Sequence, residues 1–398
     1  MWRQSCLREI GTVLGLGLRN MLLRPLLPAI VVMGFLAVVL VMVGVLSVGH
    51  GLNRTYANSG EADVALAISD GALVESQSGL GESGVRALAS EPGVAQRGAG
   101  PLVSPELVDT VELPKQGSDV VSDVVLRGVT PDAYLLHPRV HLVAGRMYRS
   151  GVREVIVGRQ ASREYRGLRV GATLRSGDLQ WTVTGIFAAD GDIHESEIWT
   201  DLPGLQDALR QPDSYSSVYL KMKSPASYRL FAEAVGKDPR LAVQVQTEKA
   251  FYTNIASGVT GAFRAVAAAI ALLMAVGAVV GAINLMYVSL AARLSDIATL
   301  RAVGFRRFPV LCALLCEGLL LGLTGGVIGG SIAYAAFDGY QAGTLFGAGR
   351  TQVDFQFSVT AGLIGGGIVF ALAMGFIGGL FPAIRAARLA VAKALRDA

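Results

Sequence analysis

Four runs of apolar residues constrain what this chain can fold into more than any other feature. The run 266–290 carries no charged residue, and in the run 310–337 the only charge is Glu317. The runs 26–49 and 357–382 carry no charge at all. A helix that crosses a membrane needs roughly 20 apolar residues, and each run reaches that length. The sequence therefore predicts four transmembrane helices.

Composition and charge distribution place a separate domain between the first two runs. The chain is 52% hydrophobic with a mean hydropathy of +0.48, which is too apolar for an ordinary soluble protein of 398 residues. Residues 51–258 have a net charge of −4 and the rest of the chain +8, which together give the formal +4. The pI near 9.0 therefore reflects basic membrane edges and gives no reason to expect a nucleic-acid partner.

Arginine placement predicts the orientation in the membrane. The segment 291–309 carries Arg293, Arg301, Arg306 and Arg307 against one acid, Asp296, and the tail 385–398 is also basic. By the positive-inside rule both lie in the cytoplasm, so residues 51–258 lie outside an inner membrane. We expect spans at 26–50, 259–290, 310–337 and 357–384, with an outer loop at 338–356. Residues 1–25 have the pattern of an amphipathic cytoplasmic helix, with a cleaved signal peptide as the rival interpretation.

Residues 51–258 contain both strand-like and helix-like patterns of apolar residues, which is typical of an α+β domain. The pattern predicts one βαβ unit from a strand at 63–68, a helix at 82–90 and a strand at 94–103. It predicts a second βαβ unit from a strand at 218–222, a helix at 225–235 and a strand at 241–245. Two such units can pair into a split sandwich, with a β-rich insertion at about 124–201 that includes a hairpin around 176–178. A helix from 247 carries Phe251, Ile255, Val259 and Phe263 at a spacing of four, and we expect it to continue into the second span as a stalk.

The segment 291–309 has its own helical pattern. Apolar residues recur at a spacing of three to four, and Gly304 is a residue type that ends helices. A short cytoplasmic helix between two spans can bind a soluble partner, or it can simply anchor on the lipid headgroups. The residues expected to contribute to partner binding by this helix are Arg293, Asp296, Ile297, Thr299, Leu300, Arg301, Val303, Gly304 and Phe305.

The third span combines a glycine stripe with one charge. Glycines spaced by four let another helix approach closely, because packing drives helix association in lipid. Glu317 is the one ionisable group within the apolar runs, and either packing and pairing or a transport role fits it. Cys312 and Cys316 share a helix face and are interpreted as packing residues. The stripe consists of Gly318, Gly322, Gly326 and Gly330.

No catalytic, cofactor-binding or metal-binding motif is recognisable. The chain has no G-x-x-x-x-G-K-[ST] and no H-E-x-x-H sequence. Asp190 to Glu197 is rich in acids and contains His194, but we interpret this run as a solvated loop rather than a cation site. Residues 51–258 contain no cysteine, so they hold no disulfide. The sequence therefore predicts that this chain is not an enzyme.

The cytoplasmic segment and the tail resemble the FtsX-like permease family of ABC transporters, and its MacB-type branch in particular. The family pattern R-x-x-E-I-G-x-L-R-A-x-G corresponds to R-L-S-D-I-A-T-L-R-A-V-G at 293–304, with Asp296 and Ala298 as departures. The tail matches A-A-R-L at 386–389 and A-L-R at 394–396, with Val391 where proline is usual. Gly128 to Pro131 and Leu142 to Arg146 resemble recurring pieces of the MacB-type domain.

This resemblance implies a permease subunit that works by mechanotransmission. Segment 291–309 would be the coupling helix that binds a separate ABC ATPase, which would hold the ATP and Mg²⁺, since this chain ends soon after its last span. The resemblance also implies a second permease copy, as a homodimer or heterodimer, and allows a periplasmic adaptor or outer-membrane channel. Two functions stay open: efflux or extraction of a substrate from the periplasm or outer leaflet, and regulation of a periplasmic partner such as a cell-wall hydrolase.

Overall fold

The computed structural model describes residues 11, 13–15, 18–19, 21–23, 25–98, 100–117, 119–176, 179–291, 299, 307–345 and 352–388. The chain divides into two compact units. One comprises 1–50, 260–340 and 356–398, and the other comprises 51–259 and 341–355. They are called the helical unit and the sheet unit below.

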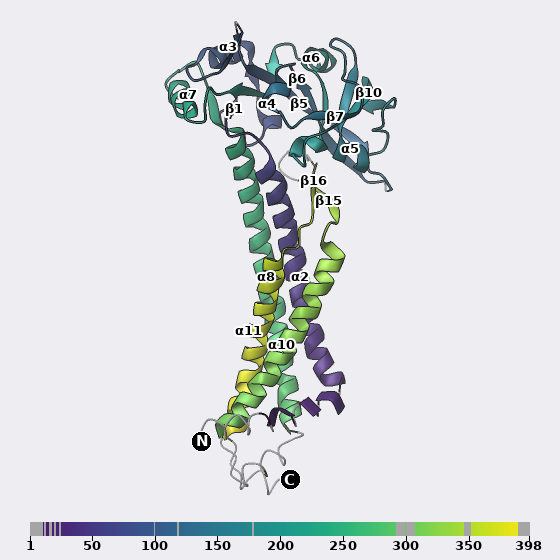
Figure 1. The fold of residues 1–398 in the computed structure, drawn as a ribbon, viewed down its shortest axis with the longest axis vertical. Helices are drawn as coiled ribbons and strands as arrows, with labels where there is room; N and C mark the ends of the chain where they lie inside the picture. The colour runs from purple at the N-terminus through teal and green to yellow at the C-terminus, as the bar shows by residue number, and fades with distance from the viewer. Residues whose placement is uncertain are drawn as a thin grey trace. The chain divides into compact units, whose positions relative to one another are not determined.

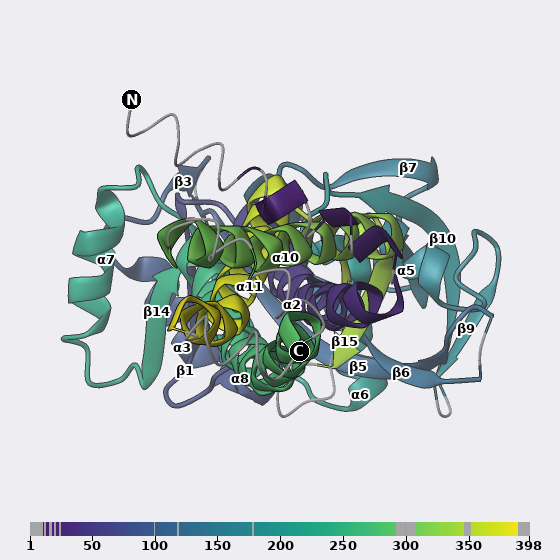
Figure 2. The same ribbon diagram turned by 90° about the horizontal axis from the view of Figure 1, so that it is seen from below.

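Four long helices form the helical unit, and Figures 1 and 2 show them side by side. All four are long and apolar enough to cross a membrane. Many of their large apolar side chains are exposed, such as Leu273 at 78% and Val369 at 66%, which suits contact with lipid or with further helices. The four helices are α2 (Leu26–Asn58), α8 (Glu248–Ala291), α10 (Arg307–Phe337) and α11 (Ala361–Arg388).

Two of these helices extend beyond the apolar runs. Helix α2 continues to Asn58 because Leu52 and Tyr56, four residues apart, are buried in the sheet unit. Helix α8 is unbroken over 44 residues, so the stalk is continuous with the span. Its buried stripe is not the expected one, however. Phe251 is buried, but Ile255 and Phe263 are only half-buried. The buried stripe begins at Tyr252 and continues through smaller residues, which are Ala256, Thr260, Ala267, Ala271 and Ala275.

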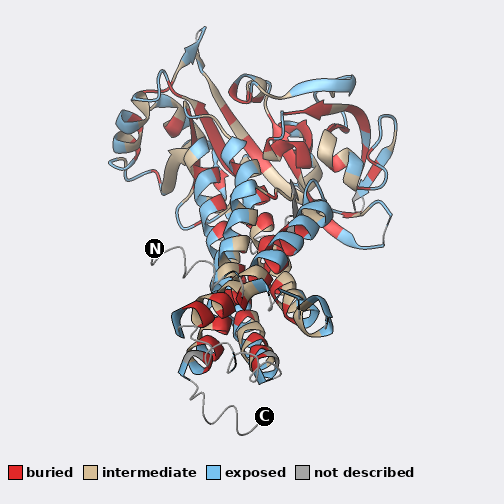
Figure 3. Ribbon diagram, turned by 60° about the horizontal axis from the view of Figure 1, so that its bottom comes forward, coloured by how far each residue is buried: buried red, intermediate tan, exposed pale blue. Residues whose placement is uncertain are grey.

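A single ten-stranded sheet organises the sheet unit, in the order β14-β1-β13-β5-β6-β11-β8-β10-β7, with β9 paired to β10. Strand β5 joins the two parts that the sequence separates: Val103 to Glu106 pair with β13, and Leu107 to Pro114 pair with β6. The insertion therefore extends the same sheet. Figure 3 shows buried residues concentrated along these strands. The strands are β1 (Val64–Ser69), β5 (Val103–Pro114), β6 (Val121–Val129), β7 (His141–Gly145), β8 (Glu154–Gly158), β9 (Thr173–Ser176), β10 (Leu179–Ala188), β11 (Ile198–Asp201), β13 (Ser217–Lys221) and β14 (Val243–Thr247).

Short helices cover this sheet and connect its strands. Both predicted βαβ helices are present, as α3 and α7. In place of the single strand expected at 94–103, the chain forms a short strand pair at 96–101, and the long strand β5 begins at Val103. The expected hairpin is formed by β9 and β10. These helices are η1 (Glu75–Gln77), α3 (Glu82–Ser90), α4 (Ala133–Leu136), α5 (Arg159–Glu164), η2 (Ile193–Ser196), α6 (Leu202–Leu209) and α7 (Ser227–Val235).

The remaining strands form three small two-stranded sheets. In one of them β15 pairs with β16, so the segment expected as an outer loop at 338–356 contains a strand pair. The strands are β2 (Leu80–Gly81) with β12 (Ser214–Tyr215), β3 (Gln96–Arg97) with β4 (Gly100–Pro101), and β15 (Gln341–Leu345) with β16 (Gln352–Gln356). Four apolar helices and a mixed α/β domain together confirm the predicted fold class.

Candidate functional site

A fully hydrogen-bonded arginine lies in the core of the sheet unit. Arg127, on β6, is 2% exposed. Its Nη1 donates to Glu75 at 2.9 Å and to Glu106 at 3.0 Å, and its Nε and Nη2 donate to the two oxygens of Glu197, both at 2.8 Å. Nη2 also donates to Glu75 at 3.0 Å. All five guanidinium N–H groups are therefore used, on carboxylates from three separate segments.

These contacts favour the charged forms of Glu75 and Glu197 despite their burial. Burial alone would raise the pKa of Glu75, but the charge of Arg127 and hydrogen bonds from Arg127, Ser217 and Tyr219 lower that pKa to about 2. The pKa of Glu197 is likewise lowered: burial opposes the shift, and the Arg127 charge outweighs it. The core thus contains an ionised network rather than neutral acids.

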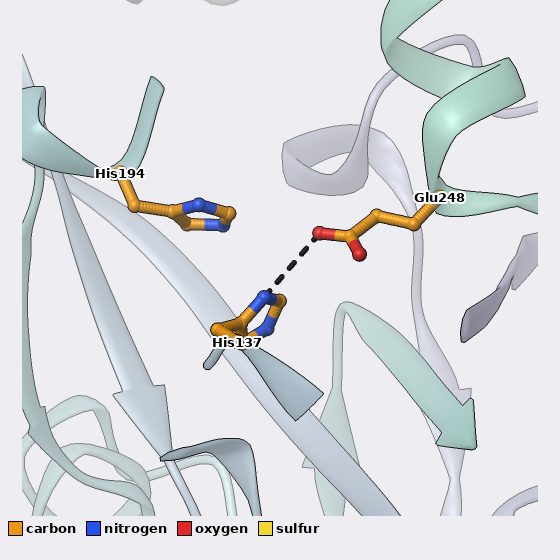
Figure 4. Close-up of side chains that lie close together, drawn as sticks. All are labelled: His137, His194 and Glu248. Atoms are coloured by element: carbon orange, nitrogen blue, oxygen red, sulfur yellow. Dashed lines mark ion pairs between the residues drawn. The ribbon is translucent and has the colours of Figure 1, made fainter. Parts of the chain in front are cut away.

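Two histidines and a glutamate lie next to this network (Figure 4). His137 follows α4, His194 lies in η2, and Glu248 is the first residue of α8. The two imidazole rings are 4.7 Å apart between centroids. His137 Nδ1 is 3.3 Å from Glu248 Oε1, while His194 Nδ1 is held by Asp192 Oδ1 at 2.6 Å. One donor atom of each of the three residues lies within 4.8 Å of the other two.

This cluster is incompletely hydrogen-bonded. Glu248 Oε2 accepts from the backbone N–H of Glu61 at 2.9 Å, but its Oε1 makes no hydrogen bond with any described residue, and neither does His137 Nε2. All three cluster residues are buried, with exposures of 5% for His137, 1% for His194 and 0% for Glu248. Burial alone would lower the pKa of His137, but Glu248 and Glu106 raise it to about 10. The site therefore favours a positive charge.

The run Asp190 to Glu197 is not the solvated loop expected from the sequence. Apart from Asp190 and Gly191, its residues are largely buried, and each of the three buried acids has a specific partner. Asp192 bonds His194 and also forms an ion pair with Arg139 at 3.0 Å. Glu195 accepts two backbone N–H groups, at 2.8 and 3.2 Å. The acids do not converge on one point, so the run by itself is no cation site.

The glycine stripe of α10 lies against α11 within the helical unit. A Cβ added at Gly318 would lie 2.5 Å from the carbonyl oxygen of Gly375, and one added at Gly322 would lie 2.5 Å from that of Ala371. The two backbones are therefore in contact, which only glycine permits. The residues of this contact, called the glycine seam below, are Gly318, Gly322, Gly326 and Gly330 on α10 and Gly375, Ala371, Ile368 and Ile364 on α11.

Comparison with family models identifies both parts of the chain. The model of the MacB-like periplasmic core domain matches residues 29–237, more than half of the chain. The model of the FtsX-like permease C-terminal region matches residues 268–391. The chain belongs to the family with a MacB-like periplasmic core domain, and its C-terminal part matches the FtsX-like permease region.

Among curated proteins, this MacB-like permease is 27% identical over 237 residues to a probable export ATP-binding/permease protein of Pseudomonas fluorescens (strain Pf0-1). It is 24% identical over 218 residues to the macrolide export ATP-binding/permease protein MacB of Neisseria gonorrhoeae. These matches cover 57% and 52% of this chain but only 35% and 32% of the relatives, so the chain spans about a third of their length.

Two solved structures resemble the MacB-like domain. The periplasmic region of MacB from Actinobacillus actinomycetemcomitans matches with a TM-score of 0.35 at 12% identity, covering 48% of this chain and 92% of that one. The extracellular domain of the ABC-type transporter YknZ from Gram-positive bacteria matches with a TM-score of 0.33 at 18% identity, covering 46% and 100%.

Most of the predicted coupling helix lies outside the described residues of this MacB-like permease. Thr299 is the exception, and it is helical and exposed. Glu317 is 2% exposed on α10, within the helical unit. The coupling residues outside the description are Arg293, Asp296, Ile297, Leu300, Arg301, Val303, Gly304 and Phe305.

Sequence reasoning missed the polar cluster in the core of the MacB-like domain. One signal was present: Arg127 interrupts the apolar strand Val124 to Val129, and a charge at a buried strand position needs a partner. The partners come from distant points of the chain, and nothing in their local pattern connects them. The missed residues are Glu75, Glu106, Arg127, His137 and Glu248.

Proposed function

We propose that this chain is the permease subunit of an ABC transporter and that it acts by mechanotransmission. A separate ATPase subunit, which supplies the ATP and Mg²⁺ chemistry, drives movement of the periplasmic domain. That movement serves efflux or extraction of a substrate from the periplasm or the outer leaflet. Family membership supports the permease role, and the continuity of α8 is the observation that carries the mechanism.

Helix α8 has the properties of a mechanical relay. Its first residue, Glu248, is fully buried in the sheet unit, and the helix runs without a break to Ala291. The segment proposed to bind the ATPase, 291–309, begins where this helix ends. An unbroken helix of 44 residues is about 66 Å long at 1.5 Å per residue, and its backbone hydrogen bonds resist bending. A displacement at one end is therefore transmitted to the other.

The helical unit supports transmission rather than passage of a substrate. The glycine seam brings two helix backbones into contact and leaves no space between them. Gly325 and Gly329 likewise lie against α2, where an added Cβ would meet Phe35 Cβ at 2.7 Å and the Leu36 oxygen at 2.8 Å. A pathway for a polar substrate needs polar side chains along the spans, and Glu317 is the one Asp, Glu, Lys or Arg residue between Val310 and Phe337.

The proposed assembly has a defined orientation. Residues 51–258 lie in the periplasm, and both termini and segment 291–309 lie in the cytoplasm of a cell with this protein in its inner membrane. A second permease copy completes the complex, with an adaptor or outer-membrane channel as a further candidate partner. Basic edges at 293–307 and 385–396 support this orientation.

The first arm of the test concerns the ATPase. In a helix at 293–303, Ile297 and Leu300 share a face. Burying one leucine contributes roughly 1.5–3 kcal/mol, and about 1.4 kcal/mol is a factor of ten in affinity. We expect Leu300→Asp to abolish copurification of the ATPase from the native host while expression and membrane insertion persist. Ala302→Asp places the same charge on the opposite face and should leave copurification intact. Wild-type copurification by Leu300→Asp would contradict the coupling helix.

The second arm concerns the relay. Four glycines inserted after Gly258 interrupt α8 at a position where an added Cβ meets nothing within 4 Å. We expect this variant to keep its ATPase and ATP hydrolysis but to lose the ATP-dependent change in deuterium uptake of the sheet unit. The same insertion after Gly151, in an exposed turn, is the control. A response that survives the interruption of α8 would refute mechanotransmission through this helix.

A further inference from the structure

Three donor side chains meet in the core of the periplasmic domain, and two of them do not complete their hydrogen bonds. They come from positions 137, 194 and 248, and a donor atom of each lies within 4.8 Å of the other two. We propose that His137, His194 and Glu248 form a binding site for a divalent transition-metal ion, and specifically for Zn²⁺. The proposal does not depend on the transport function.

The donor set and its spacing suit zinc. Two imidazoles and a carboxylate are ligands that Zn²⁺ accepts in proteins, with bonds of about 2.0–2.2 Å. Two ligands of a tetrahedral site with such bonds are separated by about 3.3 Å. His137 Nδ1 and Glu248 Oε1 are 3.3 Å apart. The ligand atom of His194 lies within 4.8 Å of that pair, so it has to approach by up to about 1.5 Å to reach a tetrahedral separation.

The Glu248 oxygen left without a hydrogen bond indicates a missing ligand. Glu248 Oε1 and His137 Nε2 make no hydrogen bond with any described residue, although both side chains are almost fully buried. A buried polar atom without a partner is costly, and proteins rarely retain one without a reason. Glu248 Oε2 is fixed by the Glu61 N–H, so its Oε1 is the oxygen that faces His137. A metal ion bound by Oε1 satisfies that oxygen.

A carboxylate already holds one of the two histidines, His194, in the manner of a metal ligand. A histidine that binds a metal through one nitrogen usually donates its other N–H to a carboxylate, which fixes the ring. Asp192 Oδ1 accepts from His194 Nδ1 at 2.6 Å, which leaves Nε2 for the metal. His137 Nε2 lies 3.7 Å from Glu106 Oε1, so its other nitrogen, Nδ1, is the one beside Glu248. Tyr252, whose hydroxyl is 3.5 Å from His194 Nε2, lies where a fourth ligand can stand.

Negatively charged groups outnumber positively charged ones around the site, so additional positive charge is needed there. Five carboxylates contact His137, His194 or Arg127, and among the described residues two guanidinium groups, those of Arg127 and Arg139, face them. A bound dication compensates much of the excess, and protons on the two imidazoles would do the same, so the experiment must separate these states. The carboxylates are those of Glu75, Glu106, Asp192, Glu197 and Glu248.

The experiment uses the full-length chain in detergent, without a polyhistidine tag and with its three cysteines replaced by alanine. After treatment with a chelator, the protein is dialysed against ZnCl₂, and bound zinc is measured by elemental analysis. We expect one zinc per chain. His194→Gln and Glu248→Gln should each weaken zinc binding at least tenfold, and Asp192→Asn should weaken it by about 10–100-fold because the ligand loses its orientation.

The chain contains its own matched controls. Of its four histidines, His50 and His141 are exposed and lie outside the cluster. His50→Gln and His141→Gln should therefore bind zinc like the wild type. Co²⁺ provides a measurement that needs no variant, since cobalt bound by two imidazoles and a carboxylate in a tetrahedral site has characteristic visible absorption bands.

Three results would overturn the proposal: no stoichiometric zinc in the wild type, no visible absorption bands at saturating Co²⁺, or zinc binding by His194→Gln equal to that of His141→Gln. The first two would show that protons, rather than a metal ion, supply the positive charge. If His194→Gln fails to fold, the Asp192→Asn affinity and the wild-type cobalt spectrum decide the question.

Discussion

Gly322→Ala should separate α10 from α11, because Gly322 lies in the glycine seam. The new Cβ would lie 2.5 Å from the carbonyl oxygen of Ala371 and 3.0 Å from its carbonyl carbon. Both atoms belong to the backbone of a helix and cannot rotate away. Since ordinary carbon–oxygen contact begins near 3.4 Å, the two helices have to move apart by about 1 Å at this point.

The energetic effect follows from that movement. A radial gap of about 0.5–1 Å removes a quarter to a half of the dispersion energy of each contact pair, and the loss extends to the neighbouring turns. Overpacking of this kind typically costs about 1–3 kcal/mol. For a unit of this size, each kcal/mol lowers the melting temperature by about 2–4 °C. We therefore expect a decrease of about 2–12 °C.

The assay is the fraction of the full-length chain that stays monodisperse in detergent after heating. Gly365→Ala on α11 is the matched control, because a Cβ added there meets nothing within 4 Å. Alanine also favours helix by up to about 1 kcal/mol over glycine, so this control should melt at or above the wild-type temperature. Equal melting of Gly322→Ala and Gly365→Ala would refute the close backbone contact.

Three further predictions concern the sheet unit and the topology. Arg127→Met should destabilise the domain by about 3–5 kcal/mol in denaturant titrations followed by Trp199 fluorescence, because it leaves buried carboxylates unpaired; an unchanged midpoint would contradict the network. The pKa of Glu75 is lowered from 4.5 to about 2, so the ionised carboxylate contributes about 3 kcal/mol to the free energy of unfolding above pH 4.5. This contribution is lost as the pH falls toward 2. Glu75→Gln should therefore flatten the acid-unfolding curve between pH 4.5 and 2, and an unchanged curve would exclude this contribution of Glu75. Reporter fusions at Gly117 and Ala398 should report opposite compartments, and a shared compartment would refute the predicted topology.

The fold was predictable where one local property decides the structure. Uncharged apolar length determines the spans, and the same runs appear as α2, α8, α10 and α11. Alternation and turn residues were sufficient for β1, β13 and the hairpin of β9 and β10. Strand β5 escaped detection because Ser104 and Glu106 occupy buried positions, where alternation alone predicts apolar residues. Their burial depends on partners from other segments, such as Arg127 and Thr130.

The polar cluster was unpredictable for the same reason. His194 and its acidic neighbours have the composition of an exposed loop, and only the tertiary structure buries them. Its partners His137 and Glu248 lie more than 50 residues away in either direction along the chain. Local sequence therefore reveals that a charge such as Arg127 is unusual, but it does not identify the groups that compensate it.

The location of the cluster bears on how the domain responds to α8. Glu248 binds the Glu61 N–H just beyond the end of α2, and Gly60, at φ +77°, approaches so closely that an added Cβ would lie 2.9 Å from the Glu248 carbonyl carbon. Tyr56 of α2 and Tyr252 of α8 lie together, with ring centroids 6.3 Å apart. Apolar surfaces can slide over one another at small cost, but moving Glu248 breaks directed polar contacts in a buried setting. The sheet unit should therefore follow the first turn of α8 as one body.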